Sequence, residues 1–290
     1  MIFNARNSSF LFAFAVLAGS PALAQTETPQ AIAHANIVYT QDQMIDVFVN
    51  PAATVDRPAP VLVYFHGGGW ARGERPKTAA SFGYFMRMGF SVVSVDYHLT
   101  AQATAPVAVT DALCALSWTQ ANAEKYHFDV SRIVAYGTSA GAHLALMAGM
   151  LPGDTAIADK KCGPVPRVAA ILDYFGPTDL EAALKVPRPS ASVVNWLGQV
   201  ENLPSLARRM SPINLVRAKL PPVFIVHGTL DPTVPYAQSV LLFDALKASD
   251  VNVEIHTVEG GGHGRFSDED KKATDSAAKA FLLSNGVLEK

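Results

Sequence analysis

A serine lies at the centre of the motif Gly137-Thr138-Ser139-Ala140-Gly141. An apolar run, Ile-Val-Ala-Tyr, precedes the motif, and a helical pattern follows it over residues 142–150. On a sharp turn between a strand and a helix, a serine hydroxyl is exposed, and the flanking residues must be small because backbone segments crowd there. The motif alone is common, but this context predicts that Ser139 is a nucleophile.

Three consecutive glycines form a second motif, His66-Gly67-Gly68-Gly69-Trp70, at the end of the apolar run 61–65. Backbone N–H groups of such a loop are free to point at a developing negative charge. We therefore expect Gly67, Gly68 and Ala140 to form an oxyanion hole. A flexible turn is the alternative, but a turn needs only one or two glycines.

A serine hydroxyl needs a base to remove its proton, and that base needs a group to orient it. Among the eight histidines, His263 stands out because it lies in the glycine run 260–264, between the last predicted strand and the last predicted helix. His143 is one helical turn past Ser139, and we expect it to pack or hydrogen-bond beneath the turn.

Asp231 is the predicted orienting acid, because it directly follows a strand and precedes His263 by 32 residues. The resulting order of serine, aspartate and histidine is the one found in α/β-hydrolases. Asp173 and Asp179, which follow the preceding strand, are the alternatives.

The elements that position these residues alternate along the chain, which predicts a mostly parallel sheet with helices on both faces, the α/β-hydrolase architecture. Strands are expected at Ile45–Asn50, Val61–His66, Ser91–Tyr97, Arg132–Gly137, Val168–Phe175, Val223–His227 and Val253–Val258. Helices are expected at Thr78–Met88, Val107–Tyr126, Ala140–Leu151, Tyr236–Ala248 and about Asp268–Asn285. Residues 177–220 are rich in proline and weakly patterned, so we predict a small cap within a single domain spanning 25–290.

The first 24 residues have the features of an export signal: Arg6, an apolar run over 10–18, and small residues near Ala24. That run is short for a membrane span. We therefore expect a secreted or periplasmic protein without a stable membrane anchor, the alternative being a retained anchor. The formal charge of −2 offers no basic excess for phosphates, which argues against nucleic acid as a partner.

The two cysteines, Cys114 and Cys162, are 48 positions apart. In an oxidising compartment they can pair, although two unrelated thiols remain the alternative because the sequence does not test the geometry. The chain has no His-x-x-His, no His-Glu-x-x-His and no cysteine cluster, and its glycine runs do not match phosphate or dinucleotide fingerprints. We expect neither a metal nor a cofactor.

From about Val61 onward, the chain resembles bacterial carboxylesterases of the hormone-sensitive-lipase-like group, in particular the bifunctional acetylxylan and feruloyl esterase (BD-FAE-like) enzymes. The matching pieces are His66–Trp70, Asp96–Leu99, Gly137–Leu144, Tyr174–Leu180, Ser211–Ile213 and the run from Pro222 through His263. The resemblance implies a catalytic triad of Ser139, Asp231 and His263. His98 departs from the family, which usually has a structural arginine there.

The resemblance and the export signal imply a hydrolase of short or aromatic acyl esters, either small molecules or esters on plant polysaccharide. Two alternatives stay open. Arylformamidases, which cleave amides, share the run Ser139–Leu144, and some proteins of this fold are inactive binding proteins, although those usually lack a triad residue. The sequence leaves the oligomeric state undetermined.

Overall fold

The structure is a computed structural model that describes residues 1–2, 31–153 and 155–289. Within these residues, eight strands form one sheet in the order β1-β2-β4-β3-β5-β6-β7-β8. β1 and β2 are antiparallel, β2 and β4 are antiparallel, and all other neighbours are parallel. The strands are β1 Ile32–Val38, β2 Met44–Val49, β3 Ala59–Phe65, β4 Ser91–Val95, β5 Phe128–Thr138, β6 Ala170–Tyr174, β7 Val223–Gly228 and β8 Val253–Val258.

The central strands are continuous apolar runs because helices cover both of their faces. Every residue of β4, β6 and β7 is buried. All seven predicted strands are present, whereas β1 was not predicted. This edge strand is almost entirely exposed, so its sequence carries no buried apolar pattern.

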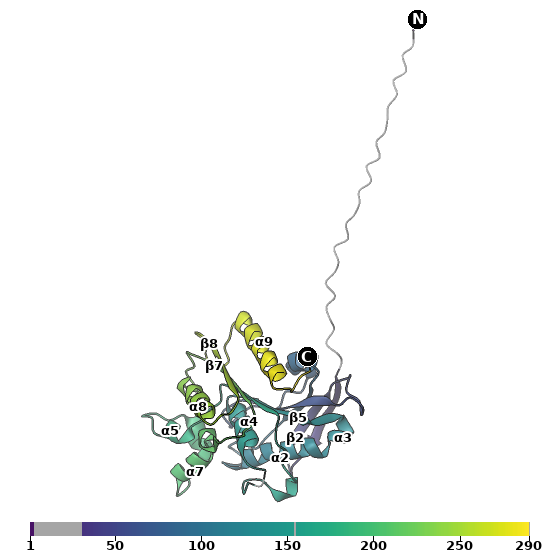
Figure 1. Ribbon diagram of the computed structural model, residues 1–290. Helices are drawn as coiled ribbons and strands as arrows, with labels where there is room; N and C mark the ends of the chain where they lie inside the picture. The colour runs from purple at the N-terminus through teal and green to yellow at the C-terminus, as the bar shows by residue number, and fades with distance from the viewer. Residues whose placement is uncertain (3–30, 154, 290) are drawn as a thin grey trace.

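Two groups of helices sandwich the sheet (Figure 1). One core joins the sheet to α2, α4 and α8, and the other joins it to α1 and α9. The helices outside the cap are η1 Ala79–Phe82, α1 Gly83–Arg87, α2 Val107–Ala121, α3 Ala123–Tyr126, α4 Ala140–Met150, η2 Lys160–Cys162, α8 Ala237–Ala248 and α9 Asp268–Ser284. The predicted helix 107–126 is divided at Asn122 into α2 and α3. At the start of α9, Ser267 and Asp270 form a capping box.

Residues 177–220 form short helices beyond the carboxyl end of β6: α5 Leu180–Leu184, α6 Ala191–Leu197, α7 Leu203–Arg209 and η3 Pro212–Leu215. We call this segment the cap. In α6, Trp196 stacks on Trp70 with ring centroids 4.6 Å apart and an interplanar angle of 13°. At the end of α7, the Met210 carbonyl accepts a hydrogen bond from Nε2 of His143 in α4 (2.7 Å). Aromatic stacking and a buried hydrogen bond therefore fasten the cap to the core.

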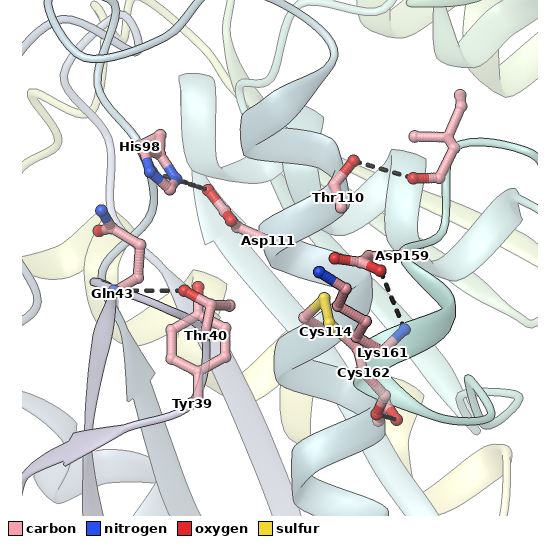
Figure 2. Close-up of a disulfide and its surroundings, with 12 residues drawn as sticks. Tyr39, Thr40, Gln43, His98, Thr110, Asp111, Cys114, Asp159, Lys161 and Cys162 are labelled. Atoms are coloured by element: carbon pink, nitrogen blue, oxygen red, sulfur yellow. Dashed lines mark hydrogen bonds and ion pairs between the residues drawn. A yellow bond between two sulfur atoms is a disulfide. The ribbon is translucent and has the colours of Figure 1, made fainter.

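A disulfide joins Cys114 in α2 to Cys162 in η2, with Cα atoms 5.1 Å apart (Figure 2). The link holds the segment between α4 and β6 against α2. Nearby, the Thr110 hydroxyl donates to the carbonyl of Ile157 in the same segment (2.9 Å). The two cysteines are therefore partners in one structural link.

Figure 2 also shows His98, the position at which the sequence departs from the family that it resembles. Its Nδ1 donates to Asp111 (2.8 Å) and its Nε2 to Asp42 (3.1 Å). Burial lowers the pKa of His98, but the hydrogen bonds and charges of the two carboxylates outweigh this effect, and the net pKa is raised. A protonated histidine can thus hold two carboxylates as an arginine would.

In the described ranges 1–2, 31–153 and 155–289, no helix combines the length and apolar character that crossing a bilayer requires. The predicted export signal, apart from Met1 and Ile2, lies outside the described residues.

Candidate active site

The residues predicted to do chemistry all follow parallel strands and so meet at one edge of the sheet. Ser139 follows β5, the glycine loop follows β3, Asp231 follows β7 and His263 follows β8. Because β3, β5, β6, β7 and β8 are parallel neighbours, their carboxyl ends lie side by side.

Ser139 occupies the strained turn that its motif predicts. Its φ is 54° and its ψ is −121°, an unusual conformation for a non-glycine residue. Side chains at Gly137 or Gly141 would collide with backbone atoms of neighbouring segments. The backbone N–H of Ser139 donates to the carbonyl of Tyr174 at the end of β6 (2.8 Å), which fixes the turn.

A continuous hydrogen-bonded series joins the three predicted residues. Nδ1–H of His263 donates to Oδ2 of Asp231 (2.6 Å), which leaves Nε2 as the acceptor. The Ser139 hydroxyl donates to this Nε2 (2.8 Å). His263 is therefore held in the tautomer and orientation that can take a proton from Ser139.

Asp231 is fully buried as a side chain and accepts four hydrogen bonds. Oδ1 accepts from the backbone N–H groups of Thr233 (2.7 Å) and Val234 (2.9 Å), while Oδ2 accepts from His263 and from His227 (3.1 Å). Burial raises the pKa of Asp231, but the hydrogen bonds outweigh it and hold the pKa well below the usual value. The carboxylate of Asp231 is therefore ionised in the folded protein at neutral pH.

The sequence did not single out His227 as part of the site. This fully buried residue donates from Nε2 to Asp231 and also to the carbonyl of Val234 (3.0 Å). Its Nδ1 accepts a hydrogen bond from the hydroxyl of Ser239 (2.6 Å). The only signal in the sequence is the spacing, because a histidine four residues before an acid can reach it across a tight turn.

The glycine-rich loop around His263 is held in place by hydrogen bonds to the loop that carries Asp231. The N–H groups of Thr229 and Leu230 donate to the carbonyls of Val258 (3.0 Å) and Gly261 (2.9 Å). Gly228 has no room for a side chain, because the backbone of Gly261 lies against it. The loops that carry the acid and the base are therefore joined to each other.

The loop of Gly67 and Gly68 lies beside Ser139: a β-carbon at Gly67 would be 3.5 Å from Cβ of Ser139. Nδ1–H of His66 donates to the carbonyl of Gly67 (2.8 Å), and burial lowers the pKa of His66. In a trans peptide, the carbonyl of one residue and the N–H of the next point in opposite directions. Fixing the Gly67 carbonyl therefore fixes the N–H of Gly68.

Ala140, the third residue expected in the oxyanion hole, begins α4, where N–H groups have no acceptor within the helix. It lines one pocket together with Ser139, Gly67 and Gly68.

The two alternative acids lie in other environments. Oδ1 of Asp173 accepts from the N–H of Gly176 (2.9 Å), and burial raises the pKa of Asp173 to about 7. Asp179 caps α5 by accepting from the N–H of Ala182 (2.8 Å). Neither carboxylate hydrogen-bonds to His263 in the described chain.

The expectation that His143 hydrogen-bonds beneath the turn is confirmed by its contact with Met210.

The site opens into a cavity of about 1170 Å³ between the core and the cap. This volume exceeds the range of roughly 300–1,000 Å³ that is typical of small-molecule sites. Ser139 and His263 line it together with apolar groups such as Phe175 and Val193. A nucleophile, a base and free N–H groups around one cavity can support attack on a carbonyl carbon. In the part of the chain that the structure describes, no group of three or more His, Cys, Asp or Glu side chains could hold a metal ion.

A family model, BD-FAE, matches residues 45–246, more than two thirds of the chain. The chain belongs to the BD-FAE family. The resemblance drawn from the sequence is thereby confirmed, which places the chain among the carboxylesterases of the hormone-sensitive-lipase-like group.

Two curated relatives are esterases of Mycobacterium tuberculosis. LipQ is 31% identical over 211 residues, which cover 71% of this chain and 50% of LipQ. LipC is 30% identical over 258 residues, which cover 85% of this chain and 63% of LipC. This chain thus spans between half and two thirds of the length of these relatives.

Solved structures of esterase 2 from Thermogutta terrifontis share the fold. The butyrate-bound form has a TM-score of 0.73 and 27% identity, covering 90% of this chain and 96% of that one. A form phosphorylated by paraoxon has a TM-score of 0.72 and 25% identity, covering 91% of this chain and 97% of that one. The predicted α/β-hydrolase fold is confirmed.

Proposed function

We propose that this protein is a carboxylic ester hydrolase that forms an acyl-enzyme on Ser139. One observation carries the proposal: the hydrogen-bonded series from Asp231 through His263 to the Ser139 hydroxyl, at the wall of the cavity. Membership of the BD-FAE family and the esterase relatives support the same reaction class.

In the proposed reaction, Oγ of Ser139 attacks the ester carbonyl carbon while Nε2 of His263 takes the hydroxyl proton. The carbonyl oxygen becomes an oxyanion, which accepts hydrogen bonds from the N–H groups of Gly67, Gly68 and Ala140. His263 then gives its proton to the departing alcohol. A water molecule repeats these steps on the acyl-enzyme, which releases the acid and restores Ser139.

We propose short or aromatic acyl esters as the substrates, including esters on plant polysaccharide. The butyrate-bound relative supports a short acyl group. The size of the cavity leaves room for an alcohol component larger than methanol or ethanol.

We also propose that residues 1–24 direct export to the periplasm or the medium. The disulfide supports this, because such bonds persist in oxidising compartments. Intact-mass analysis of the protein from the periplasm or medium should give a chain that begins at Gln25, and a purified chain retaining Met1 would contradict the proposal.

The central test is Ser139→Ala, assayed with 4-nitrophenyl acetate. We expect kcat/KM to fall about a thousandfold or more, because Ser139 is the only hydroxyl of the described chain that hydrogen-bonds to Nε2 of His263. Ser192→Ala is the matched control, since Ser192 lines the same cavity but lies outside the hydrogen-bonded series, and we expect it to retain activity within a few fold. Residual turnover by Ser139→Ala close to that of the unaltered protein would refute the proposal.

Covalent labelling provides a second readout of the same variant. Paraoxon should add one diethylphosphoryl group to the unaltered protein and none to Ser139→Ala, as detected by intact mass. A parallel assay with N-formyl anilides distinguishes esters from the substrates of arylformamidases, and we expect the esters to be cleaved faster.

A further inference from the structure

The charged side chains that line the cavity are of one sign. They are Arg72, Arg188 and Arg265, and no aspartate, glutamate or lysine of the described chain lines it. The protein as a whole has a formal charge of −2. The three positive charges at the opening therefore contrast with the negative net charge of the whole protein.

The three arginines come from separate segments that border the opening. Arg72 follows the glycine loop of residues 67–69, and its N–H donates to the carbonyl of Gly68 (3.2 Å). Arg188 lies in the cap between α5 and α6, and Arg265 is two residues past His263. The loop, the cap and the histidine segment thus each contribute one guanidinium group.

These guanidinium groups have no protein partner in the described chain, neither an ion pair nor a side-chain hydrogen bond. All three residues are exposed. The neighbouring arginine Arg75 is different, because it is buried and pairs with Asp46 (2.9 Å).

Two acids that lie close to Arg72 and Arg188 along the chain are engaged with other cations. Glu74 pairs with Lys77 (2.6 Å), and Glu181 pairs with Lys185 (2.8 Å) and Arg208 (3.0 Å). Neither of these two acids forms an ion pair with the three arginines.

We infer that the cavity takes esters that carry an oxyanionic group, such as a carboxylate or sulfate, at a distance from the scissile bond. The inference rests on the proposed function. A guanidinium group binds such anions through two parallel hydrogen bonds, and a cleft lined by one sign of charge raises the local concentration of oppositely charged substrate. The apolar groups that line the same cavity, including Phe175, are available to contact the uncharged part of such an ester.

The test compares two pairs of substrates. In one pair, 3-acetoxybenzoate and its neutral amide, 3-acetoxybenzamide, the charge lies on the leaving alcohol. In the other, mono-4-nitrophenyl adipate and 4-nitrophenyl hexanoate, it lies on the acyl group. We expect kcat/KM at low ionic strength to favour the anion about tenfold in at least one pair, and the advantage to shrink towards about 0.15 M salt.

Variants identify the groups responsible. Arg72→Gln, Arg188→Gln and Arg265→Gln should each lower kcat/KM for the preferred anion about two- to fivefold, mainly through KM, and the triple variant about tenfold or more. The neutral partner should change less than about twofold, because it makes no ion pair with these residues. Arg209→Gln is the matched control, since Arg209 is an exposed arginine of the cap that does not line the cavity, and we expect neither substrate to respond.

The outcomes separate the two proposals. Hydrolysis of none of the four esters would refute the proposed function itself. Hydrolysis without preference for either anion would overturn the present inference and leave the esterase assignment standing. A preference that survives in the triple variant would also overturn it, because the arginines would not be its cause.

Discussion

Two imidazoles meet at the carboxylate of Asp231, and their surroundings differ. His263 is partly exposed and faces Ser139, whereas His227 is fully buried and has the hydroxyl of Ser239 at its other nitrogen. Since Asp231 accepts from both rings and from two backbone N–H groups, it cannot rotate without breaking several bonds. We interpret His227 as a positioning residue that fixes the acid, which in turn fixes the base.

This interpretation predicts the behaviour of His227→Phe. The substitution removes a hydrogen bond to a charged group, worth about 1.5–3 kcal/mol, so we expect kcat to fall roughly tenfold. Because the bond from His227 lowers the pKa of Asp231, its loss raises that pKa. Protonation of Asp231 weakens its bond to His263, so the loss of kcat on the acid side of the pH profile, its acid limb, should begin at higher pH than in the unaltered protein.

His227→Gln serves as the control for this prediction, because an amide N–H can replace part of the lost bond. We expect it to recover some of the activity and to move the acid limb less. A variant His227→Phe with normal kcat and an unmoved acid limb would show that His227 only fills space.

Among the secondary-structure elements, the sequence predicted those whose buried faces leave an apolar pattern. The sequence predicted seven strands and the helices α2, α4, α8 and α9, because apolar residues repeat at the positions where these elements are buried. The exposed edge strand β1 leaves no such record. Ser139, Asp231 and His263 could be singled out from the sequence because each follows a strand, a local feature. The contacts of His227 and the grouping of the three arginines arise only when distant segments meet, so no local pattern contains them.

The stack of Trp196 on Trp70 links two segments that both border the cavity, the cap and the glycine loop. Replacing Trp196 by alanine should destabilise the protein by about 3–5 kcal/mol, as for other large core truncations. We expect KM to rise and kcat to fall as well, because the glycine loop, which carries the proposed oxyanion donors Gly67 and Gly68, loses its support. Hydrogen exchange should increase over residues 177–220.

The third tryptophan provides the comparison. Trp118 of α2 packs near Tyr126 of α3, and Trp118 does not line the cavity. Trp118→Ala should lower thermal stability with little change in KM. Equal effects of the two variants on KM would contradict a specific role for the stack.

The whole molecule is held by one large sheet and by a single covalent cross-link. The disulfide between Cys114 and Cys162 closes a loop of 48 residues, and the chain-entropy argument gives about 4 kcal/mol for a loop of that length. Neither cysteine lines the cavity. The double variant Cys114→Ala/Cys162→Ala should therefore unfold at lower denaturant concentration and keep its kcat. A lower kcat of the double variant, measured at a temperature where it is fully folded, would contradict this prediction.

The same cross-link has a consequence for the chain after a protease has cut it. Lys160 and Lys161 are exposed and lie within the closed loop, immediately before Cys162. Trypsin cleavage there would leave two fragments still tethered through their sulfur atoms, each seated in its place in the sheet. The nicked enzyme should migrate as one species until a reductant is added, and it should go on turning over substrate until then.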